Sequence, residues 1–306
     1  MKIISQQSGR LDKIIVKELS DMTRNQVSLL IKNGHIKVNQ VAIKKAGHKI
    51  KPGDIINCTI PKPTKLSLKP LQAPLDLIHE TNDYLAINKP PFLPVHPSHG
   101  HPDDTLVNIL AHHYPDFKQF GAINNTLRPG IVHRLDMNTS GIIVVAKNQP
   151  TLNKFQQDIK NRQWKKTYLA WVLNNSQKGR GVIQKNIIRH PQHRQKFTVT
   201  TSEKGKTAIT NYKIVDNFMF EKNTISLLEV QIKTGRTHQI RVHLLSESLP
   251  VLGDEVYYTK ESRIISKKIG IKRQLLHAHQ LTIFDPATNR PQSFVAPTPP
   301  DFDIKN

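Results

Sequence analysis

The stretch GIVHRLDMNTSGIIVVAK, residues 130–147, joins two apolar runs through a polar turn. The runs, 131–132 and 142–146, predict a strand, a turn and a second strand in the interior of a sheet. Arg134 and Asp136 lie in the turn, and a strand–turn–strand unit is a rigid mount for chemically active side chains. The stretch therefore predicts a candidate functional site at the tip of a hairpin.

Asp136 is the only acidic residue between Asp116 and Asp158. If Arg134 and a second arginine hold it, the carboxylate stays ionised and can serve as a nucleophile or a base. Alternatively, the carboxylate forms a structural ion pair that closes the turn. The local sequence leaves these two interpretations open.

The composition points to a polyanionic partner. The 306 residues include 45 Lys and Arg but only 23 Asp and Glu, which gives a formal net charge of +22. Such a surplus repels itself unless the chain binds nucleic acid or an anionic surface, although a generally basic surface is the plain alternative. The length is sufficient for two domains.

Cys58 is the single cysteine, which excludes an intrachain disulfide framework and a multi-cysteine zinc site. A reducing cytoplasm fits this composition. The start MKIISQQSGR lacks the apolar run of a signal peptide, and no apolar stretch is long enough to cross a bilayer. We therefore expect a cytoplasmic protein with no membrane partner. The sequence leaves the oligomeric state open, and a monomer is the default expectation.

The N-terminal residues 1–61 predict a small α/β domain. Apolar residues from Leu11 to Leu19 recur at helical spacing, and a second helix follows, with a capping box at Thr23 and Gln26. Gly34 would end that helix, and short strands follow. Basic residues surround the pattern: Arg24, Lys32, Lys37, Lys44 and Lys45. A solvated helical hairpin is the alternative.

Residues 62–74 are rich in Pro and Lys and predict an extended linker. Residues 75–306 would form the second domain. Short strands alternate there with a few helices, expected over 105–112 and 151–160, so the domain is predicted to be α+β with a mixed, mainly antiparallel sheet. The tail from residue 297 is expected to be loose.

The loop HPSHGHPDD, residues 96–104, resembles a metal-binding run. His99, His101 and Asp103 approach the HxHxDH pattern of metal-dependent hydrolases, and a zinc-activated water could cut RNA. However, Asp104 occupies the place of the last histidine. We expect no metal, and a polar loop at the rim of a pocket instead.

Several further segments carry a family resemblance. They are NKPPFLPVHPSHGHPDDTLVNIL, GIVHRLDMNTSGIIVVAK, KKTYLAWV, LLEVQIKTGRTHQIRVHLLSESLPVLGD and LLHAHQLTIFDP, in that order. Together they resemble the RluA-type family of RNA pseudouridine synthases, most closely its RluD-type members, which act on large-subunit ribosomal RNA. The N-terminal segment TRNQVSLLIKNGHIKVN with KPGD resembles the S-four-type RNA-binding domain. Departures from the family pattern are small: Met137-Asn138 after HRLD, and Phe92 where glycine is common.

The resemblance implies a role for each site residue. Asp136 would be the catalytic aspartate, which either attacks the sugar or helps to eliminate the base as a glycal. Tyr168 would stack on the flipped uracil, and Arg241 would pair with the aspartate. Further contacts to the RNA are implied for five residues: Ile240 as a wall of the uracil pocket, Arg134 in the gap left by the base, and Arg24, Lys32 and Lys37 on phosphates.

The helix that carries Arg241 can also be predicted from its own residues. Thr237 is a suitable N-cap, and Ile240 and Leu244 are spaced to face the core. Arg236, His238 and Arg241 would then project towards one site.

These observations predict an RNA pseudouridine synthase that flips its target uridine and needs no cofactor, because the isomerisation uses no external reactant. Its partner would be RNA, in the form of 23S ribosomal RNA or a pre-ribosomal particle. Two alternatives remain: an inactive RNA-binding factor for ribosome assembly, and a metal-dependent RNA hydrolase. The sequence does not identify the target uridine.

Overall fold

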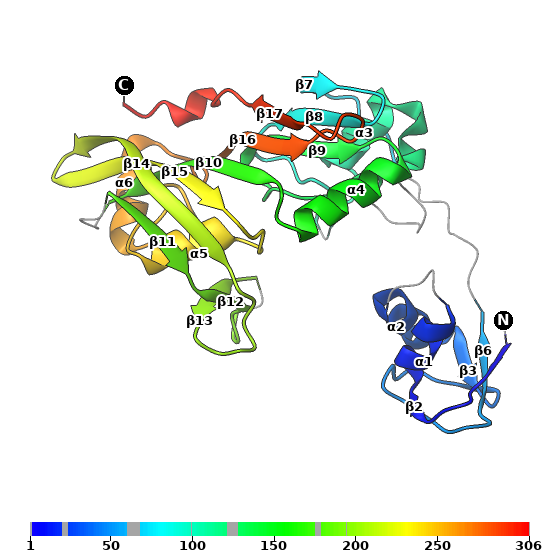
Figure 1. Ribbon diagram of the computed structural model, residues 1–306. Coiled ribbons are helices and arrows are strands. Elements are labelled where there is room, and N and C mark those ends of the chain that lie inside the picture. The colour runs from blue at the N-terminus through cyan, green and yellow to red at the C-terminus, as the bar shows by residue number, and fades with distance from the viewer. Residues whose placement is uncertain are drawn as a thin grey trace. The chain divides into compact units, whose positions relative to one another are not determined.

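The computed structural model describes residues 2–19, 24–59, 68–98, 100–120, 128–174, 179–193 and 195–305. Its contacts divide the chain into two compact units, Met1–Leu66 and Ser67–Asn306 (Figure 1). The capping box expected at Thr23 lies outside the described residues, as does the first part of the expected linker, residues 62–67. Within the described part of the chain, no helix is long and apolar enough to span a membrane.

The N-terminal unit packs two helices on a small antiparallel sheet. The helices are α1, Leu11–Glu18, and α2, Arg24–Lys32. Leu11, Ile15 and Ile31 are fully buried in a common core with the sheet residues Ile36 and Ile56, so the predicted helix–helix–strand order is confirmed. The sheet follows the order β1, Lys2–Ile4; β6, Ile55–Cys58; β3, Ile36–Val38; and β4, Val41–Ala42, beside the pair of β2, Gly9–Arg10, and β5, Lys49–Ile50.

A buried carboxylate links the two helices of this unit. The Asp12 side chain accepts hydrogen bonds from Nε of Arg10 at 3.0 Å and from Nε of Arg24 at 2.9 Å. The hydrogen bond from Arg10 contributes most to lowering the pKa of Asp12 to about 2, although burial opposes it. Arg24, predicted to contact RNA, is therefore already tied to Asp12 through one nitrogen.

The C-terminal unit is built on one nine-stranded sheet with the order β11-β14-β15-β10-β16-β9-β8-β7, and β17 pairs with β16. Of the described strand pairs, β9 and β16 run parallel and the others antiparallel, which confirms the predicted α+β class. The strands are β7, Leu77–Glu80; β8, Tyr84–Lys89; β9, Ser140–Ala146; β10, Lys165–Leu173; β11, Arg180–Gln184; β14, Ile209–Phe220; β15, Asn223–Ile232; β16, Leu276–Phe284; and β17, Pro291–Val295.

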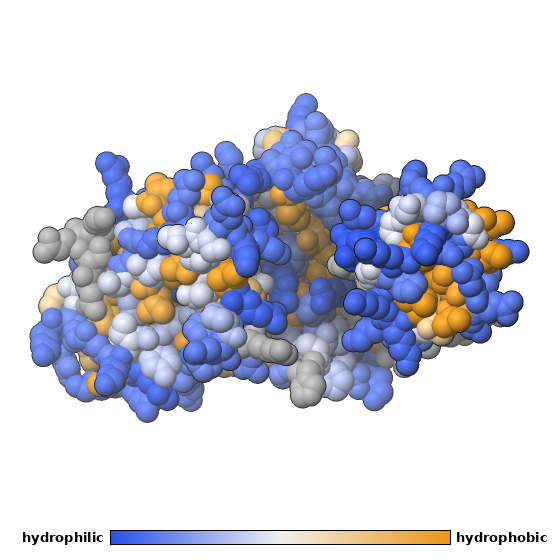
Figure 2. Space-filling model, turned by 90° about the horizontal axis from the view of Figure 1, so that it is seen from below, coloured by the Kyte–Doolittle hydropathy of each residue, from blue (hydrophilic) through white to orange (hydrophobic). Residues whose placement is uncertain are grey.

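Helices and a separate ribbon surround this sheet (Figure 1). The two-stranded ribbon, β12 with β13, forms its own small sheet. The elements are α3, Leu106–His113; the 3₁₀ helix η1, Pro115–Gln119; α4, Gln149–Lys160; β12, Asn186–Arg189; β13, Phe197–Thr200; α5, Gln239–Ser246; α6, Lys260–Ile269; and the 3₁₀ helix η2, Pro300–Phe302. On the face drawn in Figure 2, hydrophilic residues make up most of the surface.

Strand β9 is buried on both faces, which is why its sequence is a continuous apolar run. Ile142 and Val144 pack on one side with Phe155 of α4, whereas Ile143 and Val145 pack on the other side in a core that includes α3. Two packed layers therefore fix the strand that follows the turn of Asp136.

The other arm of the predicted hairpin is not a strand. Ile131 makes a single antiparallel bridge with Val145. At the preceding residue of β9, the hydrogen-bond acceptor is a side chain. The main-chain N–H of Val144 donates to Nε2 of His133 at 2.9 Å. An imidazole thus replaces the main-chain partner that a second strand would supply.

Two other predicted segments are more ordered than expected. In residues 68–74, the described part of the expected linker, Leu68 is buried in the α3 core and the carbonyl of Lys69 accepts from Asn108. The tail was expected to be loose, and this was wrong. Phe302 is buried, and its carbonyl accepts from Nε1 of Trp171 at 2.8 Å.

Gly141 is required where β9 meets β16. Its φ is +107°, and a Cβ at this position would lie 2.3 Å from the main-chain oxygen of Ala278. We therefore expect Gly141→Ala to destabilise the C-terminal unit by about 3 kcal/mol or more. Denaturation followed by tryptophan fluorescence measures this unit, because both tryptophans, Trp164 and Trp171, lie in it.

Gly270→Ala is the matched control for this prediction. Gly270 also has a positive φ, +82°, but no atom would lie within 4 Å of an added Cβ. Its substitution should cost only about 1 kcal/mol. Equal losses for the two variants would show that the contact with Ala278 is unimportant.

Candidate active site

A cavity of about 590 Å³ opens between the turn of Asp136, β10 and the start of α5. This volume is within the usual range of small-molecule sites. The predicted residues Arg134, Asp136, Tyr168, Ile240 and Arg241 all line it. Segments far apart in the sequence therefore meet at one cavity, which is the arrangement that the family resemblance implies.

Asp136 and Arg241 form an ion pair at the cavity wall. Nη1 of Arg241 donates to Oδ2 of Asp136 at 2.9 Å, and the Asp136 side chain is 20% exposed. Nε2 of His238 lies 3.9 Å from the same oxygen, beyond hydrogen-bond distance. The carboxylate is thus oriented by one guanidinium while part of it still faces the cavity.

Arg241 is itself anchored by a second acid. Its Nε and Nη2 donate to the two oxygens of Asp254 at 2.6 and 2.8 Å, in a bidentate pair that is almost fully buried. Oδ1 of Asp254 also accepts the main-chain N–H groups of Val256 and Tyr257. Burial alone would lower the pKa of Arg241, but Asp254 and Asp136 raise it above its ordinary value. The guanidinium therefore stays charged and fixed in direction.

Two buried basic side chains, Lys89 and Arg273, hold the main chain of the turn that carries Asp136. Nζ of Lys89 donates to the carbonyls of Pro90, Leu93 and Met137, and burial lowers its pKa to about 7. Nη1 of Arg273 donates to the carbonyl of Asn138 at 2.9 Å. Main-chain atoms directly after Asp136 are therefore held in place.

Tyr168 presents a free phenol to the same cavity. The side chain is largely buried in the core under α5, yet its hydroxyl makes no hydrogen bond with any residue that the structure describes. Burial, together with the charge of Asp136, raises the pKa of this hydroxyl. The phenol stays protonated, and its ring is available for stacking.

The remainder of the cavity wall is cationic. Asp136 is the only acid among the described lining residues, whereas the wall has seven arginines and lysines: Arg134, Lys160, Arg162, Lys166, Lys233, Arg236 and Arg241. Lys166 is partly buried and lies 5.7 Å from the Trp164 ring centre, without a hydrogen bond or ion pair to any described residue. Burial lowers its pKa to about 8.

The start of α5 differs from the prediction. Thr237 is not the N-cap; His238 occupies that position, with a left-handed backbone at φ 56° and ψ 19°, and the helix begins at Gln239. The Gln239 side chain accepts from the N–H of Arg236 and donates to the carbonyl of Ile209, which fixes the turn. Ile240 is buried in the core and also borders the cavity, and Arg236 and His238 line the cavity too.

Other predicted residues lie outside this cavity. Lys32 and Lys37 are exposed residues of the N-terminal unit, as is Arg24. In the histidine loop, His101 contacts Asp104 at 2.7 Å, and Asp103 pairs with Lys69. His99 is not among the described residues, and those that are described contain no group of three or more His, Cys, Asp or Glu side chains placed to hold a metal.

Sequence reasoning did not assign the second layer of the site, which comprises Asp254, Tyr257, Arg273 and Lys89. Asp254 ends the quoted segment LPVLGD, so its acid was visible in the sequence. Its partner was not, because pairing with Arg241 depends on how the chain returns after α5.

The structure thus places a single described acid, Asp136, in a cavity whose wall is otherwise cationic. Residues 83–246 match the family described as RNA pseudouridylate synthase, and residues 9–56 match the S4 domain. The chain belongs to the RNA pseudouridine synthase family, whose members convert uridine to pseudouridine in RNA, and it carries an N-terminal S4 domain.

Full-length relatives support this membership. A relative from Aquifex aeolicus, named as an uncharacterized RNA pseudouridine synthase, is 36% identical over 96% of this chain and 91% of its own length. The ribosomal large subunit pseudouridine synthase D of Salmonella typhimurium is 33% identical over 97% and 89%. The solved human RNA pseudouridylate synthase domain containing 1 is 26% identical, with a TM-score of 0.61 over 75% of this chain and 86% of that chain.

Asp254 should matter for turnover more than for RNA binding. Asp254→Asn removes one charge from the pair that directs Arg241, so we expect the single-turnover rate of pseudouridine formation to fall about 10- to 100-fold, with RNA affinity changed less than about 3-fold. Asp216→Asn is the control, since Asp216 pairs with Lys305 at the surface. An unchanged rate for Asp254→Asn would contradict the anchoring role.

Proposed function

We propose that this enzyme isomerises specific uridines of large-subunit ribosomal RNA, as 23S RNA or in a pre-ribosomal particle, with Asp136 as its catalytic residue. The observation that carries the proposal is the pair of Asp136 and Arg241 at 2.9 Å, facing a cavity that the phenol of Tyr168 also lines. The choice of RNA is supported by the Salmonella typhimurium relative, whose name specifies the large ribosomal subunit.

The target uridine must leave its stack before it can enter the cavity, at a cost of a few kcal/mol in a duplex. Stacking on Tyr168 would offset about 1–3 kcal/mol of this cost, and Ile240 would form the apolar wall opposite the polar edge of the base. The exposed guanidinium of Arg134 would fill the space that the base leaves.

The reaction exchanges one bond to the ribose for another. The N1–C1′ bond breaks and its electron pair stays with uracil; the base then turns, C5 bonds to C1′, and the proton on C5 is lost while N1 gains one. Asp136, oriented by Arg241, would act at C1′ as a nucleophile or assist elimination to a glycal. Both routes need a carboxylate that is held in one direction and is partly accessible, as Asp136 is.

The N-terminal S4 domain would add affinity for RNA through Arg24, Lys32 and Lys37. Phosphate contacts of this kind position an RNA without reading its sequence. We propose that the enzyme acts as a monomer, since the residues that line the cavity all belong to the C-terminal unit.

An inactive RNA-binding factor is the second candidate, and no observation favours it. Binding alone requires neither an acid in a cationic cleft nor an anchored arginine beside it, because a lone carboxylate weakens the attraction for phosphates. The metal-dependent hydrolase has no supporting observation among the described residues.

Asp136→Asn should abolish isomerisation without weakening RNA binding. The amide is of nearly the same size but cannot act as nucleophile or base, so we expect the rate of tritium release from RNA labelled at uracil C5 to fall ~1,000-fold or more. RNA affinity, measured by filter binding, should stay within about 2-fold. Asp116→Asn, at an exposed position, is the control. A near-normal rate for Asp136→Asn would refute the role of this residue.

Lys166 should bind a phosphate of the RNA, since it lines the cavity and forms no ion pair with any described residue. With a pKa of about 8, it is charged below pH 8 and loses its charge above it, so RNA affinity should fall as the pH rises from 7 to 9. Lys166→Gln should lower the affinity at pH 7, reduce this pH dependence, and lower the salt slope of binding by about 1.

Lys165→Gln is the matched control for Lys166. Lys165 is the preceding residue of β10, is exposed, and lies on the opposite face of the strand by alternation. If the two variants have the same affinity and pH dependence, Lys166 does not contact the RNA.

A further inference from the structure

His238 has a strained backbone next to the proposed catalytic acid. Its φ of 56° is in the left-handed region, which costs a non-glycine residue about 1–2 kcal/mol. Such strain persists only where surrounding contacts impose it, and it concentrates at functional sites. The conformation brings the imidazole to the cavity wall, with Nε2 3.9 Å from Oδ2 of Asp136.

Tyr257 imposes the orientation of this imidazole. Its hydroxyl lies 2.9 Å from Nδ1 of His238 and accepts the main-chain N–H of Phe197 at 2.7 Å. The Arg241 guanidinium lies 4.9 Å from the centre of the Tyr257 ring. The buried phenol of Tyr257 therefore contacts both His238 and Arg241, the two side chains that face Asp136.

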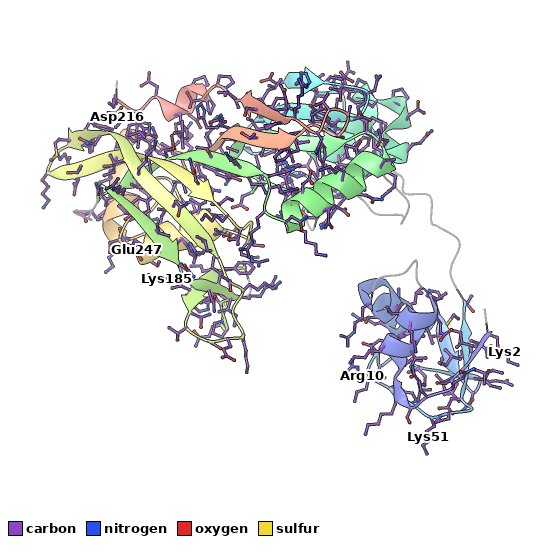
Figure 3. The ribbon with its side chains drawn as sticks, viewed as in Figure 1. Lys2, Arg10, Lys51, Lys185, Asp216 and Glu247 are labelled. Carbon is purple, nitrogen blue, oxygen red and sulfur yellow. The ribbon has the colours of Figure 1, made fainter. Side chains whose placement is uncertain are left out.

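The ribbon of β12 and β13 reinforces this arrangement at two points. Phe197, the first residue of β13, packs edge-on against the His238 ring with centres 5.7 Å apart. Lys185, just before β12, donates to Oε1 of Glu247 at the end of α5, at 2.7 Å (Figure 3). The ribbon is thus joined to both ends of the helix that follows His238.

These contacts determine which ring nitrogen carries the proton. The Tyr257 oxygen already accepts from Phe197, and its own proton has no acceptor other than Nδ1 of His238 among the described residues. A hydrogen bond from this hydroxyl to Nδ1 satisfies that proton, and in a neutral imidazole it requires the ring proton to be on Nε2. Burial lowers the pKa of His238, although Asp136 opposes this, which favours the neutral ring.

Nε2–H is left without a protein partner in the described chain. Its distance of 3.9 Å to Asp136 is too long for a hydrogen bond, and that oxygen is occupied by Arg241. A polar donor on a cavity wall, held in one tautomer by a buried hydroxyl, is preorganised for a ligand atom.

We propose that His238 is a substrate-contacting residue, whose neutral Nε2–H donates a hydrogen bond to an oxygen of the target uridine beside the breaking bond, and that Tyr257 is the positioning residue which fixes its tautomer. This assignment rests on the proposed function. When the N1–C1′ bond breaks, its electron pair stays with uracil and the charge is shared by N1, O2 and O4. A hydrogen bond to O2 stabilises that anion, and no proton is transferred from His238.

The neutrality of His238 is also useful to Asp136. A protonated imidazole 3.9 Å away would attract the carboxylate and reduce its reactivity towards C1′. A neutral donor can stabilise the departing base while the carboxylate keeps its charge.

NMR of the full-length protein with ¹⁵N-labelled histidine tests the tautomer without any substrate. His238→Asn identifies the resonances of His238 among the 15 histidines, because it removes them. We expect the wild-type spectrum to show a protonated Nε2 and an unprotonated Nδ1, and Tyr257→Phe to give a mixture of tautomers. A proton on Nδ1 in the wild type would overturn the assignment.

Two amide substitutions test the contact with substrate. The side-chain nitrogen of glutamine reaches roughly as far as Nε2, whereas that of asparagine reaches only as far as Nδ1, and asparagine tolerates the left-handed backbone. We expect His238→Gln to lower the single-turnover rate about 3- to 10-fold and His238→Asn about 30- to 100-fold. RNA affinity should stay within about 2-fold in both. Equal rates for the two variants, or a rate that His238→Asn leaves unchanged, would overturn the proposal.

Tyr257→Phe keeps the ring beside Arg241 but removes the hydroxyl, and should lower the rate about 10-fold. Tyr258→Phe is the control, because Tyr258 is exposed and outside the cavity. If the wild-type chain releases no tritium from ribosomal RNA, the proposed function fails and the substrate contact with it, while the NMR spectrum still decides the tautomer. A rate unchanged by Tyr257→Phe would overturn the positioning role.

Discussion

One guanidinium, that of Arg241, holds two carboxylates in fixed positions, and the rest of the site depends on it. Two of its nitrogens bind the buried Asp254, and a third binds Asp136 at the cavity wall. A buried charge pair with bidentate geometry is costly to break, because either partner alone would be left unpaired. The three nitrogens of Arg241 are therefore all occupied by these two acids. The guanidinium holds Asp136 in one direction and leaves the charge of the carboxylate in place. Two carboxylates share one guanidinium, so one negative charge is left over. The other arginines and lysines of the cavity wall balance it.

The polar groups of the site fall into two sets: those bonded to other protein groups, and those available to a ligand. Lys89, Arg273 and Asp254 are saturated with protein partners and hold main-chain turns. Lys166 and the hydroxyl of Tyr168, by contrast, have no hydrogen-bond or ion-pair partner among the described residues, and both residues line the cavity. A site that keeps an acid, a phenol and a cation free while it fixes everything behind them is suited to an extruded nucleotide with its phosphate.

Local patterns predicted the elements that their own residues specify. The run 142–146 predicted β9, and helical spacing predicted α1 and α4 near their observed bounds. The predictions failed where a contact between a side chain and the main chain, which no local pattern specifies, decides the structure. The His133 side chain takes the place of the main-chain partner that a second strand would supply to Val144. The burial of Phe302 depends on its contact with Trp171. The acid behind Arg241 could be seen in the sequence, but its pairing could not, because pairing follows from tertiary packing alone.

The central claim is that Asp136, directed by Arg241, acts at the C1′ atom of an extruded uridine. A crystal structure of the Asp136→Asn protein bound to a target RNA fragment measures this most directly. The account predicts a flipped uridine stacked on Tyr168, with C1′ about 3–3.5 Å from the side chain of residue 136, the separation of reacting atoms. A uridine that remains stacked in the RNA, or that binds with C1′ remote from residue 136, would contradict it.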